Sequence, residues 1–468
     1  MNYLLEEARQ IPATEADVLV VGGGTSGCIA ALAAARFGAK TVLIERHAVL
    51  GGTFTNGGNS VNSFYNTTDH PDKAIRIVGG LPYEMIQRMI REGAAEDFRP
   101  TAKDSHRVPY RCSSVNSEMY KGIMAKMLEE AGVHVMLQTY FCDVVAKGTV
   151  IKAAIIQNKD GRSAIFAKEY VDCSGDGDVA RFTGVHMIEN WEHYDCGCSS
   201  TGMVFALGGV DLNRTAEEGG PAMRSKRSAD GQVVSVQFCY VDDSKYQRFT
   251  DMLEWYWMNI RAMEEHSDVV YVAYYTGPKT NCSNAENYSQ AELHERIKIV
   301  DMVRAFRDTV PGFERCFPVW SATQLGIRAS LAADCDKILS EEEIEHAARF
   351  NDEIGLYGYH DLSARDIEFQ DRPKARFPHC MVGQPGYYGM PYRMLLPKGC
   401  DNLFMAGRCV TVDVEAHMST RNTVGCMIMG QGAGTAAAIC AEKRYKSREL
   451  PYAELRESLL KQGAILSL

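Results

Sequence analysis

One short stretch near the N-terminus, residues 17–45, constrains the fold more than any other part of the sequence. The apolar run DVLVV at residues 17–21 predicts a buried strand, and a glycine-rich turn with GxGxxG spacing follows it at once. An alanine-rich helix over residues 28–37 and a second strand over residues 41–44 come next, and Glu45 stands at the end of that strand. Such a βαβ unit directs helix N–H groups at a pyrophosphate and a carboxylate at a ribose, so the sequence predicts a dinucleotide site.

The βαβ unit alone does not distinguish NAD from FAD. No second strand–GxGxxG–helix unit follows it in the chain. The sequence therefore has room for one dinucleotide, and not for a flavin together with a separate nicotinamide domain.

Composition narrows the range of partners and compartments. The 468 residues include 60 acidic and 50 basic side chains, a net charge of −10 that disfavours nucleic acid as a partner. No run of eighteen apolar residues predicts a membrane span, and the N-terminus has acids where a signal peptide has lysines. The 15 cysteines are scattered without a CxxC pair, and Cys196 and Cys198 have no second paired cluster. We expect a cytoplasmic protein without a metal.

Four further motifs follow in a characteristic order. They are a glycine-rich loop at residues 50–58, a strand with an acidic turn (YVDCSGDGD) at residues 170–178, a strand (NLFMAGR) at residues 402–408, and a small-residue helix over residues 427–441. Together with the N-terminal unit they resemble the FAD-dependent oxidoreductases of the glutathione-reductase-like superfamily. The resemblance extends over residues 17–438, and it implies FAD as the cofactor.

The resemblance also implies a domain organisation. We expect an α/β protein in which a discontinuous Rossmann-like FAD-binding domain, residues 1–185 and 386–445, carries an inserted α+β substrate domain, residues 186–385, and a helical tail, residues 446–468. Composition agrees, since all four tryptophans lie in the middle segment. Each of these aromatic residues alone fits a core, but together they indicate an aromatic-walled pocket: Trp191, Trp255, Trp257 and Trp320, with Tyr256, Tyr271, Tyr274 and Tyr275 nearby.

The expected cofactor contacts come from the glycine motifs and from the start of the last helix. That helix start would point at the pyrimidine edge of the flavin, and its N–H groups would favour the anionic reduced form. We expect non-covalent attachment, because the loop after the second strand carries no histidine suited to a covalent link. The cofactor-binding residues implied by the resemblance are Gly22, Gly24, Thr25, Ser26, Gly27, Glu45, Arg46, Gly52, Thr53, Phe141, Gly175, Asp176, Gly407, Arg408, Val424, Gly425 and Cys426.

Three residues near the C-terminal helix are the candidate catalytic groups. His417 and Arg421 are four apart, so in a helix or turn they project from one side. Their spacing resembles the histidine and arginine that grip a substrate carboxylate in flavin-dependent fumarate reductases and succinate dehydrogenases. A salt bridge that holds the loop is the alternative for Arg421. Arg393 is expected to line the same cavity, whereas Arg328 suits a domain seam equally well.

The combined expectation is an FAD-dependent oxidoreductase. It would transfer a hydride between FAD and a small organic substrate bearing a carboxylate or hydroxyl, with a separate electron donor or acceptor that the sequence does not identify. The alternative is a flavin-binding redox subunit or sensor of a partner complex without its own small-molecule substrate. A homo-oligomer is compatible with the sequence but not required by it.

Overall fold

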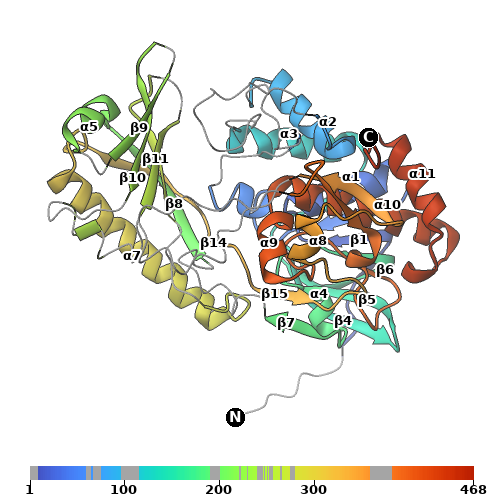
Figure 1. Ribbon diagram of the computed structural model, residues 1–468. Coiled ribbons are helices and arrows are strands. Elements are labelled where there is room, and N and C mark those ends of the chain that lie inside the picture. The colour runs from blue at the N-terminus through green and yellow to red at the C-terminus, as the bar shows by residue number, and fades with distance from the viewer. Residues whose placement is uncertain are drawn as a thin grey trace.

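The computed structural model describes most of the chain in two lobes (Figure 1). The described residues are 9–58, 65–66, 75–95, 115–189, 201–220, 223–228, 230–239, 246, 248–249, 251, 257–263, 266–274, 280–358 and 382–468. Cys196, Cys198, Trp191, Trp255, Tyr256 and Tyr275 lie outside them, as do the side chains of Trp257 and Tyr274.

The larger lobe is built on a seven-stranded mixed sheet of order β3-β2-β1-β6-β5-β4, with β18 beside the end of β6. β1 pairs in parallel with β2 and β6, and β18 is parallel to β6, whereas β4 and β5 are antiparallel additions. The strands are β1 (Ala13–Val21), β2 (Thr41–Ile44), β3 (His134–Met136), β4 (Tyr140–Lys147), β5 (Val150–Asn158), β6 (Gly161–Asp172) and β18 (Leu403–Met405).

Helices from both ends of the chain cover this sheet. Figure 1 shows the blue N-terminal elements side by side with the red C-terminal ones in the right-hand lobe. The α-helices are α1 (Thr25–Arg36), α2 (Gly80–Arg91), α3 (Ser117–Glu130), α4 (Asp178–Phe182), α8 (Glu341–Glu345), α9 (Val414–Thr420), α10 (Thr423–Lys443) and α11 (Tyr452–Lys461). Short 3₁₀ turns are η1 (Gly52–Phe54), η5 (Tyr392–Leu395) and η6 (Ser447–Glu449).

Two small strand pairs complete the larger lobe. β7 (Met187–Glu189) pairs with β15 (Leu331–Ala333), and β16 (Glu353–Tyr357) pairs with β17 (Tyr388–Pro391). Residues 331–358, which the sequence assigns to the middle segment, pack in the core of this lobe together with α1 and α10.

The smaller lobe is an antiparallel sheet of order β13-β8-β12-β11-β10-β9, with β14 beside β8, and the helices α5 and α7. Buried side chains of α7, including Met302 and Phe306, share one core with Phe205 of β8. The elements are β8 (Thr201–Gly208), α5 (Leu212–Glu218), β9 (Met223–Arg227), β10 (Val233–Cys239), β11 (Trp257–Ala262), β12 (Val270–Tyr274), α7 (Ala285–Thr309), β13 (Phe317–Ser321) and β14 (Gly326–Ile327). The expected architecture, an α/β dinucleotide-binding lobe with a separate substrate-domain sheet, is confirmed.

Helix α1 begins at Thr25, three residues before the alanine-rich run that predicts it, and packs closely against α10. A Cβ atom added at Gly430 would overlap the carbonyl oxygen of Ser26, and one at Gly434 would overlap that of Ala30. The glycines therefore allow the backbones of the two helices to meet. Within the described chain, α10 is the one helix long and apolar enough to cross a membrane, and its apolar window is entirely buried in the fold.

We predict that Gly434→Ala lowers the free energy of unfolding by about 1–3 kcal/mol, because the new methyl group forces α10 away from α1. The matched control is Gly122→Ala in α3, where an added Cβ meets nothing within 4 Å. This control should be neutral or stabilising by about 0.5–1 kcal/mol. Urea denaturation measures both, and equal effects of the two substitutions would contradict the close-packing argument.

Candidate active site

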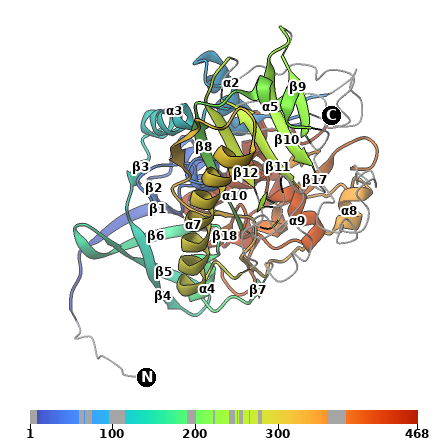
Figure 2. The same ribbon diagram turned by 90° about the vertical axis from the view of Figure 1, so that its left-hand side faces the viewer.

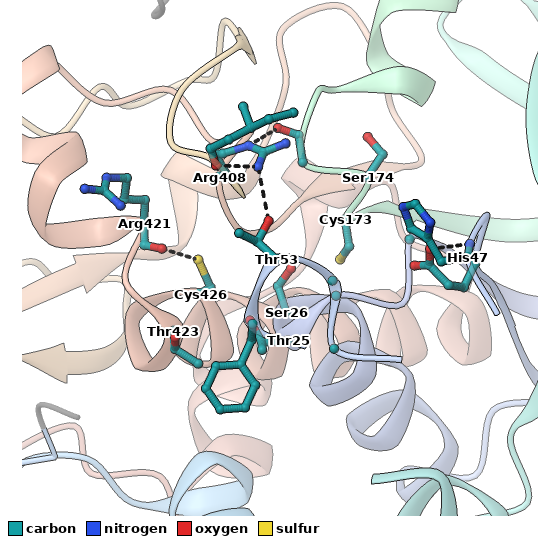
Figure 3. A pocket seen from close by; sticks show the side chains of 18 of the residues that line it. Thr25, Ser26, His47, Thr53, Cys173, Ser174, Arg408, Arg421, Thr423 and Cys426 are labelled. Carbon is teal, nitrogen blue, oxygen red and sulfur yellow. Dashed lines mark hydrogen bonds between the residues drawn. The ribbon is translucent and has the colours of Figure 1, made fainter. Parts of the chain in front are cut away.

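A cavity lies where the carboxyl ends of β1, β2 and β6 meet the smaller lobe, with about 990 Å³ of empty space including its opening to solvent. Figure 3 shows it as extended, with His47 toward one side and Arg421 toward the other. The lining residues are Gly22, Gly24, Thr25, Ser26, Glu45, Arg46, His47, Gly51, Gly52, Thr53, Phe54, Cys173, Ser174, Gly175, Gln324, Ile327, Arg328, Arg408, Arg421, Asn422, Thr423 and Cys426.

The turn between β1 and α1 supplies the floor of the cavity. Gly24 is the N-cap residue of α1 and has no side chain to accept from the first N–H groups of the helix. Thr25 and Ser26 line the cavity beside these donors, so the helix presents its positive end there. Gly27 does not line the cavity; a Cβ at this position would overlap the carbonyl oxygen of Gly22, so its role is to keep the turn compact.

Glu45 is held at one end of the cavity by backbone donors. Its carboxylate accepts hydrogen bonds from the N–H of Gly23 at 2.6 Å and from the N–H of His47 at 2.8 Å. Burial raises the pKa of Glu45, and the two backbone hydrogen bonds act against that shift. The carboxylate is therefore fixed next to the glycine turn, as the βαβ pattern predicts, while its role in binding a ribose stays a prediction.

The glycine-rich loop after β2 approaches the first turn of α1 at backbone distance. A Cβ added at Gly52 would lie 2.9 Å from the Cα of Gly24, and Gly52 has a φ of +55°. The two backbones can meet this closely only because neither glycine carries a side chain. Thr53 follows in η1 and lines the same cavity.

Arg408 ties three parts of the cavity wall together. Its guanidinium donates to the carbonyl oxygens of Gly175 at 2.9 Å and Ile327 at 2.8 Å, and to the carboxylate of Asp176 at 2.8 Å. Asp176 is buried, also accepts from the Ser330 hydroxyl at 2.6 Å, and does not line the cavity itself. Arg408 thus joins the acidic turn to the smaller lobe. Asp176, which we expected to contact the cofactor, instead holds the Arg408 side chain at the cavity.

Asp172 is a structural acid of this wall that the motif reading missed. One oxygen of its carboxylate accepts from the N–H and the hydroxyl of Ser174, and the other accepts from the N–H groups of Val179 and Ala180. Asp172 therefore caps α4 and shapes the acidic turn from behind. The signal was available in the sequence, because this acid ends the strand just before the SGDGD turn.

The start of α10 closes the other end of the cavity. Asn422 is the N-cap residue, but its side-chain amide donates to the carbonyl oxygens of Met418 and Ser419, so the first N–H groups of α10 have no side-chain cap. Thr423 and Cys426 line the cavity. Two residues predicted to contact the cofactor do not line it: Val424 is fully buried, and a Cβ at Gly425 would lie 2.5 Å from the carbonyl oxygen of Thr420.

Arg421, the C-cap residue of α9, brings a positive charge to this end of the cavity. Its Nη2 lies 3.5 Å from the sulfur of Met418, and its Nε is buried without a hydrogen-bond partner. By contrast, Arg46 and Arg408 both contact the carboxylate of Asp176, at 3.8 and 2.8 Å. Within the described part of the chain no carboxylate pairs with Arg421, so the salt bridge considered for it is not formed there.

His417 does not line the cavity, contrary to its expected place beside Arg421. Its side chain is 1% exposed, and Nε2 donates to the carbonyl oxygen of Arg408 at 3.2 Å. Burial lowers the pKa of His417 to about 3, and the positive charges of Arg421 and Arg408 act in the same direction. The imidazole is therefore a neutral group that holds the segment carrying Arg408, because its ring turns into the core.

Three other predicted site residues also lie away from the cavity. Arg393 binds the carboxylate of Asp352 through Nε at 2.9 Å, and its side chain is 53% exposed. Phe141 of β4 packs its ring against Phe182 at 5.7 Å between centroids. Gly407 lies behind the wall, where a Cβ would come within 2.6 Å of the Ser26 hydroxyl oxygen. Their local motifs did not reveal these tertiary partners.

Several lining residues were not among the predicted contacts. The smaller lobe contributes Gln324, Ile327 and Arg328. Of these, the sequence analysis considered only Arg328, as a residue suited to the boundary between domains. The main-chain N–H of Gln324 donates to the carbonyl oxygen of Asn56 at 3.3 Å, and the Thr323 hydroxyl donates to the Asn56 side chain at 3.1 Å. This contact between lobes brings the segment to the cavity. In the described residues no group of three or more His, Cys, Asp and Glu side chains is arranged for a metal ion.

Parallel strands that lead into a glycine turn, together with two uncapped helix N-termini at one cavity beside a second lobe, define a dinucleotide-binding protein. The chain belongs to the FAD dependent oxidoreductase family, whose sequence model matches residues 17–459. Its cofactor is therefore FAD, and the FAD interpretation is confirmed over NAD.

Similar proteins match either a short segment or the general fold. Over 44 residues the chain is 52% identical to mitochondrial dihydrolipoyl dehydrogenase of Caenorhabditis elegans and to leghemoglobin reductase of Glycine max. Each match covers 9% of this chain, and 9% and 8% of those two proteins, respectively.

Two solved structures are similar over most of the chain. A geranylgeranyl bacteriochlorophyll reductase-like protein of Thermoplasma acidophilum matches with a TM-score of 0.44 and 12% identity, covering 97% of this chain and 85% of that one. The p-nitrophenol 4-monooxygenase PnpA of Pseudomonas putida DLL-E4 matches with a TM-score of 0.45 and 11% identity, covering 97% and 88%.

The described lining fits FAD. Gly24 and Gly52 line the cavity without side chains next to the uncapped start of α1, so a diphosphate in the cavity can approach the main-chain N–H groups there. Glu45 would hold the ribose at one end, and the segment from Arg421 to Cys426 would face the flavin at the other.

We predict that Gly52→Ala weakens FAD binding at least tenfold, because the methyl group overlaps the Gly24 backbone and displaces the glycine loop from the cavity wall. Gly148→Ala is the matched control: Gly148 has a similar φ of +61°, but an added Cβ meets nothing within 4 Å. Bound flavin is counted by its absorbance after acid release, and affinity by titration of the apoprotein. Equal loss of flavin in both variants would assign the effect to backbone strain alone.

We also predict that, because of His417, the free energy of unfolding decreases as the pH is lowered. Its folded pKa lies below the unfolded value of 6.5, so the neutral ring contributes fully above that pH and its contribution is lost as the pH falls toward about 3. By pH 5 the loss amounts to roughly 2 kcal/mol. His417→Gln should therefore lower stability at pH 7 yet lose about 2 kcal/mol less between pH 7 and pH 5, as measured by urea denaturation. An unchanged pH dependence would contradict this.

Proposed function

We propose that this FAD-dependent oxidoreductase transfers a hydride between non-covalently bound FAD and a small organic substrate that carries a carboxylate. The observation that supports the proposal is Arg421, a cavity arginine with a buried, unpartnered Nε and no described carboxylate beside it. An arginine in such a position binds a carboxylate through charge-assisted hydrogen bonds. When bound, FAD supplies the redox chemistry.

The chain's own residues would orient the substrate and limit its access to water. Arg421 would fix the carboxylate, and the uncapped start of α10 beside it would add N–H donors of positive potential. Gln324, Ile327 and Arg328 of the smaller lobe would cover the substrate from the opposite side. His417, turned into the core, holds the Arg408 carbonyl and has no part in proton transfer.

Non-covalent attachment is part of the proposal. His47 lies at the Glu45 end of the cavity, where its Nε2 accepts from the side chain of Arg46 at 3.3 Å. That position is distant from the segment expected to face the flavin. Acid precipitation should leave the flavin in the supernatant, and flavin retained in the pellet would contradict the proposal.

A second candidate is a redox subunit or sensor that uses the flavin without its own small substrate. It is favoured by the turn of His417 into the core, which leaves the described lining near Arg421 without a histidine or carboxylate for proton transfer. Anaerobic mixing with a panel of small organic acids separates the two candidates. Bleaching of bound flavin by one acid supports the enzyme, whereas an unchanged spectrum with every acid, for both oxidised and reduced protein, supports the subunit.

We predict that Arg421→Gln slows flavin reduction or reoxidation by the active acid roughly 100-fold, because one charge-assisted contact is lost. The primary amide of the same acid should be a poor substrate for the wild type, and the substitution should change its rate less than threefold. Arg393→Gln is the matched control, since Arg393 pairs with Asp352 away from the cavity. Stopped-flow absorbance measures these rates. Equal losses in both arginine variants would remove Arg421 from substrate binding.

A further inference from the structure

The outer face of α7 carries an apolar stripe. Leu293, Ile297 and Val300 are spaced by four and three residues, so they lie along one side of the helix. Their exposed fractions are 64%, 65% and 50%, whereas the opposite side of α7 is buried in the core of the smaller lobe. Figure 2 shows α7 on the face turned toward the viewer, at the front of the molecule. A helix whose solvent side is apolar usually covers a partner.

The edge strand β13 carries two further exposed apolar side chains. Phe317 and Val319 are 52% and 48% exposed, and the Phe317 ring lies next to Gly208 and Gly209. The strand runs beside α7, because Arg307 donates to the carbonyl oxygen of Cys316 at 2.8 Å and Arg296 donates to that of Ala322 at 2.6 Å. Five of the fifteen exposed large apolar side chains of the described chain therefore border α7 and β13. We call these five residues the α7 patch.

The edge of β13 itself is poorly suited to pairing with another strand. Pro318 lacks an N–H group, and the register with β8 shifts between Pro318 and Trp320. A proline and an irregularity in an edge strand disfavour strand addition. The α7 patch therefore offers its side chains, rather than a row of backbone donors and acceptors, to a partner.

We propose that the α7 patch is a two-fold interface with a second copy of this chain, in which two α7 helices pack antiparallel. The charges at the ends of the stripe are complementary for this arrangement, since Glu286 lies near the start of α7 and Arg307 near its end, both exposed. With the two-fold axis between Arg296 and Ile297, Leu293 of each copy faces Val300 of the other. Glu286 of each copy then faces Arg307 of the other. A two-fold interface uses the same patch twice, so the match holds at both ends.

The first test is the oligomeric state of the purified holoprotein by analytical ultracentrifugation over a range of concentrations. The wild type should form a dimer, and the double substitution Ile297→Glu with Val300→Glu should weaken it at least 30-fold while retaining bound FAD. Val145→Glu is the matched control: Val145 is 52% exposed on β4 and lies in the other lobe. A monomeric wild type at tens of micromolar, which would leave the patch for another partner, or a dimer that persists in the double variant, would overturn the proposal.

Exchanging the charges of Glu286 and Arg307 tests the antiparallel geometry separately from non-specific hydrophobic association. Glu286→Arg alone and Arg307→Glu alone should each weaken the dimer about tenfold, because like charges then face each other across the interface. The two substitutions combined should restore the dimer to within threefold of the wild type. Loss of restoration, with bound FAD and thermal stability unchanged, would overturn the antiparallel arrangement.

Discussion

The contact between the backbones of α1 and α10 is the constraint on which the cavity depends. Gly430 and Gly434 lie against the carbonyl oxygens of Ser26 and Ala30, so two helices about 400 residues apart in the chain pack without intervening side chains. Their N-termini consequently open on the same cavity, one beside Glu45 and the other beside Arg421. Two helix starts without side-chain caps provide the positive potential that a diphosphate and a reduced flavin both favour.

Arg408 also holds the cavity wall together, and its contacts explain why His417 and Arg421 have different surroundings. Its side chain joins the acidic turn to the smaller lobe, while its carbonyl oxygen accepts from His417. The histidine is committed to this contact in the core. Arg421, four residues later, has no comparable partner and reaches the cavity. Residues on one side of a helix can therefore differ in role, because the last turn of α9 faces two environments.

The parts of the site that the sequence predicted well are those specified by local backbone chemistry. The turn after β1, the acid after β2 and the small residues of α10 each have their reason within a few residues of chain, and the structure brings them to one place. Arg393 failed as a cavity residue because its partner, Asp352, comes from a different segment. Gln324 and Ile327 were missed because nothing in a local motif reports the approach of the smaller lobe, although Gln324 and its neighbour Thr323 both contact Asn56 of the glycine loop.

The smaller lobe connects the surface of the molecule to the cavity through α7. On the inner side of this helix, Glu292 accepts from the N–H of Leu325 at 2.7 Å, and Arg296 donates to the hydroxyl of Ser321 and the carbonyl of Ala322. These contacts hold both ends of the loop that presents Gln324 to the cavity. The same helix carries the exposed stripe on its outer side. The proposed interface and the loop that reaches the cofactor cavity are therefore attached to two sides of one helix.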